Sequence, residues 1–350
     1  MTDPIPGVRI TRDADLRKLN TFGVDARAPW LVEVDDASRL ADVFADIPLS
    51  GTTPLVLGGG SNVLFVGAPS EPVLRLTGTR IRLIDDDGTT VRIKVDAGFG
   101  WHQLVMRTLD DGLTGLENLA LIPGTAGAAP IQNIGAYGVE VRELIDAVHA
   151  FEPATGRHVR LSNEECGFAY RDSVFKHEPS RYIVTAVEFR LRGGGAPNLS
   201  YAGIADELAE RGVNSPTARD VAEAVIAIRR RKLPDPAIVG NAGSFFKNPI
   251  VSADVADTLL AEHPQLPAFA AGDGLRKLSA AWLIDSAGLR GYRDGDAGVS
   301  PGHALVLVNH GGASGADLLR VARHVASTVR DRYGIALEPE PRLIGGSWAE

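Results

Sequence analysis

Residues Ile122 to Gly138 read IPGTAGAAPIQNIGAYG, a run of small, apolar and amide side chains without a single charge. A solvated loop of this length normally carries Ser, Asp or Lys. Because glycine has no Cβ, backbone N–H groups beside it can approach a ligand closely, and successive N–H groups turned the same way bind anions such as phosphates. The composition therefore favours a nucleotide or a cofactor pyrophosphate on this segment. The alternative is a glycine-rich connection packed under a helix.

Length, composition and charge limit the class of protein. The chain has 350 residues, of which 44% are hydrophobic, and this supports two or three domains. We see no apolar run long enough for a membrane span and no apolar signal region in MTDPIPGVRITRDADL. The single cysteine, Cys166, suits a reducing cytoplasm. The formal charge of -8 argues against general nucleic-acid binding but not against a phosphorylated small molecule.

A second glycine-rich turn lies earlier in the chain. Leu55–Leu57 predicts a buried strand that runs into Gly58-Gly59-Gly60-Ser61-Asn62, and the apolar run Val63–Val66 follows at once. The dinucleotide fingerprint needs G-x-G-x-x-G at the start of a helix, but the sixth position here is Val63. A P-loop needs Gly-Lys-Ser/Thr, which is missing after the turn. The Rossmann and P-loop classes are therefore excluded here.

The remaining patterns predict an α+β fold, with many strands and few helices before residue 192 and more helices after it. Strands are expected at Ile81–Ile84, Val91–Val95, Leu144–Phe151, His158–Leu161, Tyr182–Leu191 and Ala304–Val308. One helix is expected after a capping Asp35 or Asp36, with Leu40, Val43, Phe44 and Ile47 on its apolar face. Another is expected to begin at Ser215, with Pro216 in the first helical position. Further helices are expected at Trp101–Leu109, from Ser252, at Leu278–Ala287 and at Gly315–Arg332. Pro-Asp-Pro at 234–236 marks the best domain boundary.

Three clusters of side chains could carry chemistry. Arg171 lies in Tyr170-Arg171-Asp172-Ser173, where its guanidinium could fork onto a substrate carboxylate. Ser244 lies in NAGSFFKNP, where aromatic rings and a lysine could shift proton affinities in a dry pocket. Glu340 has a proline on each side, which fixes the backbone around its carboxylate.

Each cluster also has a structural interpretation. Arg171 and Asp172 could form a surface ion pair, the serine cluster could be a turn packed by its phenyl rings, and Glu340 could lie in a solvated terminal loop. The basic run Arg229–Lys232 could simply complement the dipole at a helix end. The scattered histidines and single cysteine favour no metal site, and the Gly-x-Ser-x-Gly elbow of hydrolases is missing.

Taken together and in order, these segments resemble the UDP-N-acetylenolpyruvoylglucosamine reductase family. The resemblance runs through most of the chain and is carried by NTFG at Asn20–Gly23, LGGGSNVLF at Leu57–Phe65, GLENLALIPGTAGAAPIQNIGAYGVEV at Gly115–Val141, YRDSVFKHE at Tyr170–Glu178, KLPDP at Lys232–Pro236, NAGSFFKNP at Asn241–Pro249, KLSAAWLID at Lys277–Asp285, ALVLVN at Ala304–Asn309 and LEPEPRLIG at Leu337–Gly345. Tyr201 and the residues around it resemble the subtype with an inserted tyrosine loop.

The resemblance implies a fold and a reaction. It implies a two-part FAD-binding region of the vanillyl-alcohol-oxidase (PCMH) type and a smaller α+β substrate-binding domain. The expected parts are 1–80, then 81–233 with 334–350 returning to it, and 234–333 for substrate. FAD would take hydride from NADPH and pass it to the enolpyruvyl double bond of UDP-N-acetylglucosamine enolpyruvate, giving UDP-N-acetylmuramate for peptidoglycan. The enzyme would be a cytoplasmic monomer without a metal, a nucleic-acid partner or a membrane partner.

The resemblance also implies roles for single residues. Ser244 would donate the proton, with Arg171 and Glu340 stabilising the intermediate. Substrate would be held by Tyr201, Lys232, Asn248 and Lys277. FAD would be held without a covalent bond, since the glycine-rich loop has no histidine, by Gly58, Gly59, Gly60, Ser61, Asn62, Pro123, Gly124, Thr125, Gly127, Ala128, Ile131, Gln132, Asn133, Gly135 and Tyr137. The competing hypotheses are another FAD-dependent oxidase of the same superfamily and a non-enzymatic nucleotide-sugar-binding protein.

Overall fold

The structure is a computed structural model that describes residues 5–45 and 49–349. The chain forms two compact units, and both are discontinuous in sequence. Unit 1 comprises residues 1–14, 28–59 and 70–229, and unit 2 comprises residues 15–27, 60–69 and 230–350. The glycine-rich turn at 58–62 therefore passes from one unit to the other between Gly59 and Gly60.

The smaller sheet of unit 1 has the strand order β1-β2-β5-β3. Its strands are β1 (Val8–Asp15), β2 (Arg27–Val34), β5 (Val73–Leu76) and β3 (Leu55–Val56), and β5 runs parallel to both β2 and β3. The predicted helix after Asp36 is confirmed as α1 (Leu40–Ala45), which follows a short 3-10 turn capped by Asp36. Leu40 and Val43 are buried, and Ile47 lies outside the described residues.

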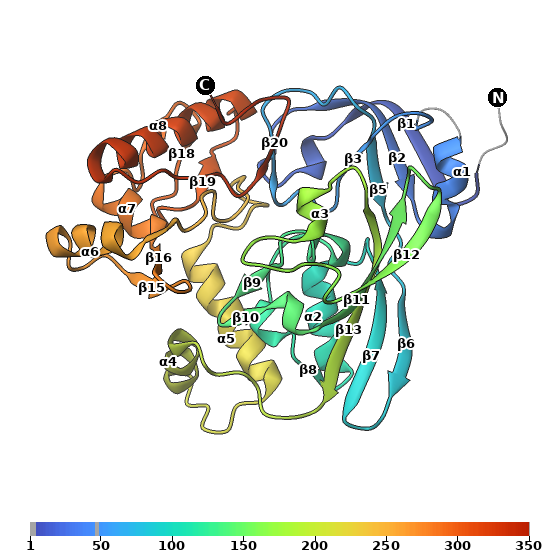
Figure 1. Cartoon of the computed structure of the whole chain (residues 1–350), viewed down its shortest axis with the longest axis horizontal. Helices are drawn as coiled ribbons and strands as arrows, with labels where there is room; N and C mark the ends of the chain where they lie inside the picture. The colour runs from blue at the N-terminus through green and yellow to red at the C-terminus, as the bar shows by residue number, and fades with distance from the viewer. Residues whose placement is uncertain (1–4, 46–48, 350) are drawn as a thin grey trace. The chain divides into compact units, whose positions relative to one another are not determined.

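The larger sheet of unit 1 is antiparallel, and the glycine-rich segment bonds to Ala97, the residue that follows one of its strands. Its order is β12 (Arg157–Ser162), β11 (Ile145–Glu152), β13 (Ile183–Gly193), β7 (Thr90–Asp96) and β6 (Ile81–Asp86), with β8 (Leu113–Thr114) also paired to β13. One face is apolar and forms a core with α2 (Trp101–Asp110) and α5 (Ala218–Lys232), which lie beside it in Figure 1. Trp101 and Phe189 meet there edge to face, with ring centroids 6.0 Å apart.

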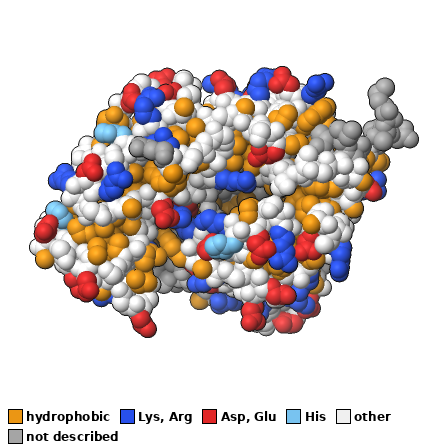
Figure 2. All heavy atoms as spheres, turned by 45° about the horizontal axis from the view of Figure 1, so that its top comes forward, with side chains coloured by type: hydrophobic (Ala, Val, Ile, Leu, Met, Phe, Trp, Pro, Cys, Tyr) orange, Lys and Arg blue, Asp and Glu red, His pale blue; other side chains and the backbone are white. Residues whose placement is uncertain are grey.

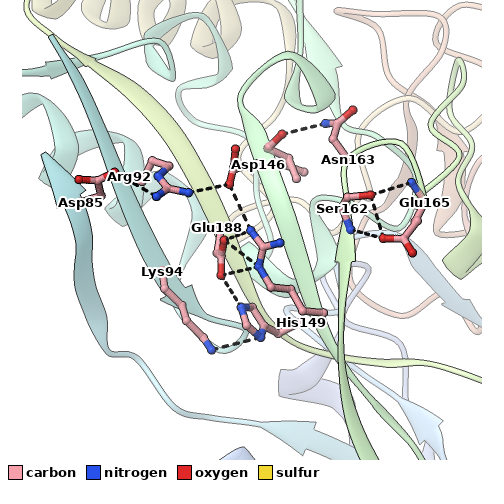
Figure 3. A network of polar contacts seen from close by, with 11 residues as sticks. Asp85, Arg92, Lys94, Asp146, His149, Ser162, Asn163, Glu165 and Glu188 are labelled. Carbon is pink, nitrogen blue, oxygen red and sulfur yellow. Dashed lines mark hydrogen bonds and ion pairs between the residues drawn. The ribbon is translucent and has the colours of Figure 1, made fainter. Parts of the chain in front are cut away.

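The opposite face of this sheet carries a network of charged side chains (Figure 3). Glu188 on β13, with 8% of its side chain exposed, lies 2.6 Å from Arg160 Nη2 and 2.6 Å from His149 Nε2. Lys94 Nζ lies 3.2 Å from the other ring nitrogen of His149, Nδ1. Asp146 accepts a further bond from Arg160 at 3.2 Å. The alternation of apolar and charged residues along each strand therefore gives one packed face and one polar face.

One expectation about helices in unit 1 was wrong, and one helix was not predicted. α5 begins at Ala218, so Pro216 precedes the helix and does not occupy its first position. Thr217 and Asp220 cap each other's backbone N–H groups, at 2.8 and 3.2 Å, and so fix the start of the helix beyond the proline. A helix, α4 (Ala202–Glu210), also follows Tyr201 directly, where none was predicted.

Unit 2 consists of short strands and three helices within its described residues. β4 (Val63–Phe65) pairs parallel with β20 (Arg342–Ile344), and the two antiparallel sheets are β14-β16-β15 and β17-β18-β19. These strands span Ile250–Ser252, Leu275–Leu278, Ala268–Ala270, Arg293–Asp294, Ala297–Val299 and Leu307–Asn309, and the helices α6, α7 and α8 span Ala253–Glu262, Ala280–Ser286 and Gly315–Tyr333.

The strand predicted at Ala304–Val308 is shorter and starts later. Val306 N–H donates to His303 O at 3.0 Å, so residues 303–306 form a turn and β19 begins only at Leu307. The long helix is confirmed as α8, with a capping box between Ser314 and Asp317 and a left-handed Gly334 at its end. The fold class is α+β, as predicted.

Surface charge and helix length bear on possible partners. On the face drawn in Figure 2, Lys and Arg side chains are interspersed with Asp and Glu. Among residues 5–45 and 49–349, no helix combines the length and the apolar character needed to cross a bilayer.

Candidate functional site

The glycine-rich segment 122–138 belongs to unit 1 and lies against the start of α2. Trp101 N–H donates to Gly124 O at 3.0 Å, and Gly127 N–H donates to Ala97 O at 2.9 Å. A Cβ on Gly127 would lie 2.5 Å from the Cβ of Ala97. Glycine at position 127 is therefore required by packing against the chain, which is the structural interpretation at this one position.

Gly58 and Gly59 bring a second loop directly against this segment, within unit 1. A Cβ on Gly59 would lie 2.8 Å from Gly124 Cα, and one on Gly58 would lie 2.9 Å from Thr125 Oγ1. The N–H groups of Gly58, Gly59, Gly124 and Thr125 donate to no acceptor in the part of the chain that the structure describes. Two touching loops thus present free backbone donors, the arrangement that binds phosphate groups.

The other cofactor candidates of unit 1 shape the same segment. Asn133 is buried, with Nδ2 donating to Glu140 Oε2 at 3.0 Å and to Ala169 O at 2.9 Å. Its Oδ1 accepts from Arg142 N at 3.1 Å, so these bonds hold the turn rather than a ligand. Gly135 begins the short β9 (Gly135–Ala136), which pairs with β10 (Val139–Glu140). The remaining candidates in this segment are Pro123, Ala128, Ile131, Gln132 and Tyr137.

Gly60, Ser61 and Asn62 lie in unit 2, where their neighbours are different. Thr21 N–H donates to Gly60 O at 3.0 Å, and a Cβ on Gly60 would lie 1.9 Å from Leu19 O. Asn62 Nδ2 donates to Glu340 O at 3.3 Å. The end of this turn is therefore fixed beside the candidate Glu340 within unit 2.

Arg171 is held on the glycine-rich segment of unit 1. Its Nη2 donates to Gly135 O at 2.9 Å and its Nη1 to Asn133 O at 3.4 Å. It precedes the short α3 (Val174–His177) and has φ 54°, a left-handed conformation that is strained for a residue other than glycine. Such strain concentrates at functional sites, where the surrounding structure enforces it. The guanidinium is thus fixed in place, as its predicted role requires.

Ser244 and Glu340 are brought together by backbone contacts in unit 2. Glu340 N–H donates to Phe245 O at 2.8 Å, and Phe246 forms an isolated bridge with Pro339. Ser244 is half-buried and forms another bridge with Val306. Residues almost a hundred positions apart in sequence therefore lie on neighbouring stretches of chain.

The four predicted substrate residues divide between the units. Tyr201, in unit 1, is 38% exposed and meets Tyr137 edge to face at 5.1 Å between ring centroids. In unit 2, Asn248 Oδ1 accepts from Ala280 N at the start of α7, at 3.0 Å, which gives Asn248 a capping role. Lys277 lies on β16 between two exposed apolar residues on the neighbouring strands.

Burial lowers the pKa of His303, which lies in the turn before β19, and the charge of Lys232 lowers this pKa further. His303 Nδ1 accepts from Leu305 N–H at 3.2 Å, so a neutral ring carries its proton on Nε2. His303 is therefore a neutral donor held near a candidate substrate cation.

Two residues of unit 1 escaped the sequence reasoning. Arg229 Nε donates to Leu121 O at 3.2 Å, and its guanidinium also bonds Tyr137. Burial lowers the pKa of Arg229, and Tyr137 raises it; no described carboxylate forms an ion pair with it. In sequence Arg229 is one of four consecutive cations, so only its burial distinguishes it. The second residue is Asn118, which is fully buried.

Among residues 5–45 and 49–349, no group of three or more His, Cys, Asp or Glu side chains could hold a metal ion. Cys166 is buried, and burial raises the pKa of its thiol to about 12. The thiol is therefore unreactive at neutral pH.

The chain is similar in sequence to two known domain families and to several named proteins. Residues 235–344 match the family model "UDP-N-acetylenolpyruvoylglucosamine reductase, C-terminal domain", and residues 28–162 match "FAD binding domain". The chain is 50% identical over 337 residues to the UDP-N-acetylenolpyruvoylglucosamine reductase of Xylella fastidiosa (strain M12), covering 96% of each chain. It is 52% identical over 341 residues to that of Xanthomonas campestris pv. campestris (strain B100), covering 97% of each.

A solved structure is similar as well. The crystal structure of UDP-N-acetylenolpyruvylglucosamine reductase from Thermus caldophilus aligns with a TM-score of 0.66 at 28% sequence identity. The alignment covers 96% of this chain and 98% of that one. Similarity of sequence and of fold therefore both extend over nearly the whole chain.

Proposed function

Because the chain belongs to the UDP-N-acetylenolpyruvoylglucosamine reductase family, we propose that it reduces UDP-N-acetylglucosamine enolpyruvate to UDP-N-acetylmuramate for peptidoglycan synthesis. We propose NADPH as the reductant and FAD as the resident cofactor, held without a covalent bond. A cytoplasmic monomer is the proposed form. The tyrosine-loop subtype is proposed from Tyr201.

The observation that carries the proposal is the pair of touching loops in unit 1. Their N–H groups at Gly58, Gly59, Gly124 and Thr125 are free, and the loops approach so closely that a Cβ on Gly59 would clash. Free backbone donors on two touching glycine loops suit the pyrophosphate of FAD. A half-buried guanidinium at Arg229, without a carboxylate partner in the described chain, adds positive charge to the same segment.

Arg171, Ser244 and Glu340 are proposed to complete the reaction. FAD supplies hydride chemistry once it is bound. Negative charge then grows on the carboxylate side of the enolpyruvyl group, where a fixed guanidinium such as that of Arg171 stabilises the transition state most. The hydroxyl of Ser244 donates a proton to the substrate carbon, and Glu340, whose backbone is hydrogen-bonded to Phe245, stabilises the intermediate together with Arg171.

Binding roles are proposed for the remaining candidates. Lys232 and Lys277 supply positive charge for the phosphates or carboxylate of substrate, Tyr201 a hydroxyl and a ring, and Asn248 an amide. Gly60, Ser61 and Asn62 extend the cofactor loop into unit 2. Residues 1–80 and 81–233 with 334–350 form the proposed FAD region, and residues 234–333 the proposed substrate domain.

One assay separates this proposal from its alternatives. The visible spectrum of the purified protein is recorded, and NADPH oxidation is then followed with and without UDP-N-acetylglucosamine enolpyruvate. The reductase shows a bound flavin and turnover that depends on this substrate. An oxidase of the same superfamily would consume oxygen without it, and a nucleotide-sugar-binding protein would be colourless; either result contradicts the proposal.

A further inference from the structure

We propose that Asn118 is a positioning residue that joins the loop before Tyr201 to the glycine-rich segment, so that order in the loop depends on that segment. The inference rests on the proposed function, since it concerns the segment assigned to FAD and the tyrosine assigned to substrate. Every contact that carries it lies within unit 1.

The geometry of Asn118 places one amide between two distant stretches of chain. Asn118 lies in the 3-10 turn Glu117–Leu119 and is 0% exposed. Its Nδ2 donates to Tyr137 O at 2.9 Å and to Asn198 O at 3.0 Å. An amide nitrogen has two hydrogens, so both are used. Asn118 therefore ties the last turn of the glycine-rich segment to the loop that leads to Tyr201.

On the side of the cofactor segment, the bond supports a strained residue. Tyr137 has φ 50°, a conformation that costs a non-glycine residue on the order of 1–3 kcal/mol unless its surroundings enforce it. The bond from Asn118 to its carbonyl and the bond from Arg229 to its side chain both fix it. Its ring then meets that of Tyr201. The conformation of the segment at Tyr137 therefore affects the position of the Tyr201 ring, which it contacts.

On the side of the loop, Asn118 is one of two anchors. Thr114 Oγ1 donates to Gly194 O at 3.0 Å at the start of the loop, and Asn118 holds Asn198 near its end. Ser200 Oγ lies 2.8 Å from the place of a Cβ on Gly138, so this end packs directly on the segment. The Asn118 side chain connects the loop to the segment, because its Nδ2 donates to a carbonyl of each.

The side-chain oxygen of Asn118 indicates that this residue positions the chain and does not bind a ligand. Asn118 Oδ1 is buried and has no hydrogen-bond partner among the described residues. An unmet buried acceptor costs about 1–3 kcal/mol. Because Asn118 has no exposed surface, a ligand cannot touch it without a rearrangement of the chain. The two bonds from Nδ2 are therefore the reason for an amide at this position.

The test measures hydrogen exchange of residues 194–201 with and without FAD, which does not depend on turnover. In the wild-type chain, FAD should slow exchange in this loop. In Asn118→Leu, exchange should be about tenfold faster and insensitive to FAD. Thr114→Val removes the other anchor and is the matched control: exchange near Gly194 should rise, while the response near Tyr201 to FAD should remain.

A kinetic measurement separates positioning from a merely structural role. Asn118→Asp keeps the size of the side chain but loses both donors, so KM for the enolpyruvyl substrate should rise about tenfold. Reduction of the bound flavin by NADPH should stay within about twofold of wild type. Combined with Tyr201→Ala, the Asn118→Asp change should have little further effect, because contacting residues that act through one another are not additive.

Outcomes that overturn the inference are distinct from failure of the proposed function. Wild-type exchange in residues 194–201 of both Asn118 variants, or fully additive KM effects with Tyr201→Ala, would overturn it. Should Asn118→Leu not fold, the isosteric Asn118→Asp gives the same two readings. A wild-type chain that ignores the enolpyruvyl substrate would end the proposed function, yet the exchange response to FAD would still test Asn118.

Discussion

Ser244 shows how much a single residue depends on its neighbours. Its segment lies beside both Val306 and the residues around Glu340, so the backbone at Ser244 is held on two sides. Arg171 is fixed in the other unit by carbonyls of the glycine-rich segment. The backbone of Ser244 and the side chain of Arg171 are thus held by bridges and hydrogen bonds, and this suits the proposed roles of proton donor and charge stabiliser.

Ser244→Ala should separate the two half-reactions. Reduction of the flavin by NADPH should be unchanged, while reoxidation by substrate should slow by about 10²–10⁴-fold, the usual contribution of a general acid. Stopped-flow absorbance at the flavin band measures each half-reaction. Ser252→Ala is the control: it removes the cap of α6 and should lower stability by about 1 kcal/mol without a kinetic effect. Equal slowing of both half-reactions in Ser244→Ala would remove the proton-donor role.

The candidate residues found from sequence share a property that Asn118 and Arg229 lack. Arg171, Ser244 and Glu340 stand in motifs with unusual neighbours, such as two prolines or two phenylalanines, so they could be singled out. Asn118 is a common amide in an apolar stretch, and its importance depends on Asn198, far along the chain. Burial and long-range hydrogen bonds are properties of the fold and could not be read from the residue types.

At the scale of elements, the proposed cofactor site depends on the contact between the two glycine loops. Gly59→Ala should push its loop away from Gly124, because the new Cβ would lie 2.8 Å from Gly124 Cα. Overpacking of this kind costs about 1–3 kcal/mol, so the Kd for FAD should rise about tenfold, measured by flavin fluorescence on reconstitution. In the control Gly193→Ala, the new Cβ would lie 3.4 Å from Gly88 O, an ordinary contact distance. This variant should bind FAD as the wild type does. Equal affinity in both variants would contradict the proposed cofactor site.

The polar face of the large sheet should make stability depend on acid pH. Burial raises the pKa of Glu188, but hydrogen bonds from Arg160 and His149 outweigh this and hold it at about 2, below the ordinary 4.5. Burial lowers the pKa of His149 below 6.5, and the hydrogen bond with Glu188, which raises this pKa, does not fully offset the effect. Both groups bind protons more readily when unfolded, so both stabilise the fold at high pH and lose this effect as pH falls.

The free energy of unfolding should therefore decline below about pH 6.5 and more steeply below about pH 4.5, by a few kcal/mol in total. Urea unfolding followed by tryptophan fluorescence at several pH values measures this. Glu188→Gln should be less stable at neutral pH and should flatten the decline below pH 4.5. Glu210→Gln, on the exposed face of α4, should leave the shape of the curve unchanged. An unaltered slope in Glu188→Gln would exclude the network as its source.

Elements with a local signal were predicted, and elements defined by distant partners were not. The hairpin β6–β7, helix α2 and helix α8 follow from alternation, helical spacing and capping residues in one stretch. The start of α5 was misplaced because Thr217 and Asp220 cap it beyond Pro216. The pairing of β4 with β20 joins residues at opposite ends of the sequence, and no local pattern contains it.

At the scale of the whole molecule, FAD should raise thermal stability through its pyrophosphate. A ligand at a hundredfold excess over Kd adds about 2.7 kcal/mol to the folded state, so Tm of the flavin-stripped protein should rise by several degrees. Riboflavin lacks the phosphates and should give a much smaller shift at equal concentration. Differential scanning calorimetry measures both. Equal shifts from FAD and riboflavin would show that the free N–H groups of the two loops do not bind the pyrophosphate.

The parallel pairing of β20 with β4 has a consequence for biosynthesis. Unit 2 draws on residues 15–27, 60–69 and 230–350, so its first two pieces leave the ribosome long before their partners exist. Until Arg342–Ile344 has been made, β4 has no neighbouring strand and Ser244 has no Glu340 beside it. A nascent chain can assemble the sheets of unit 1 during synthesis, but the proposed proton-donor site forms only after residues 340–344 have been made, and chains that stall before them should be inactive and open to proteolysis.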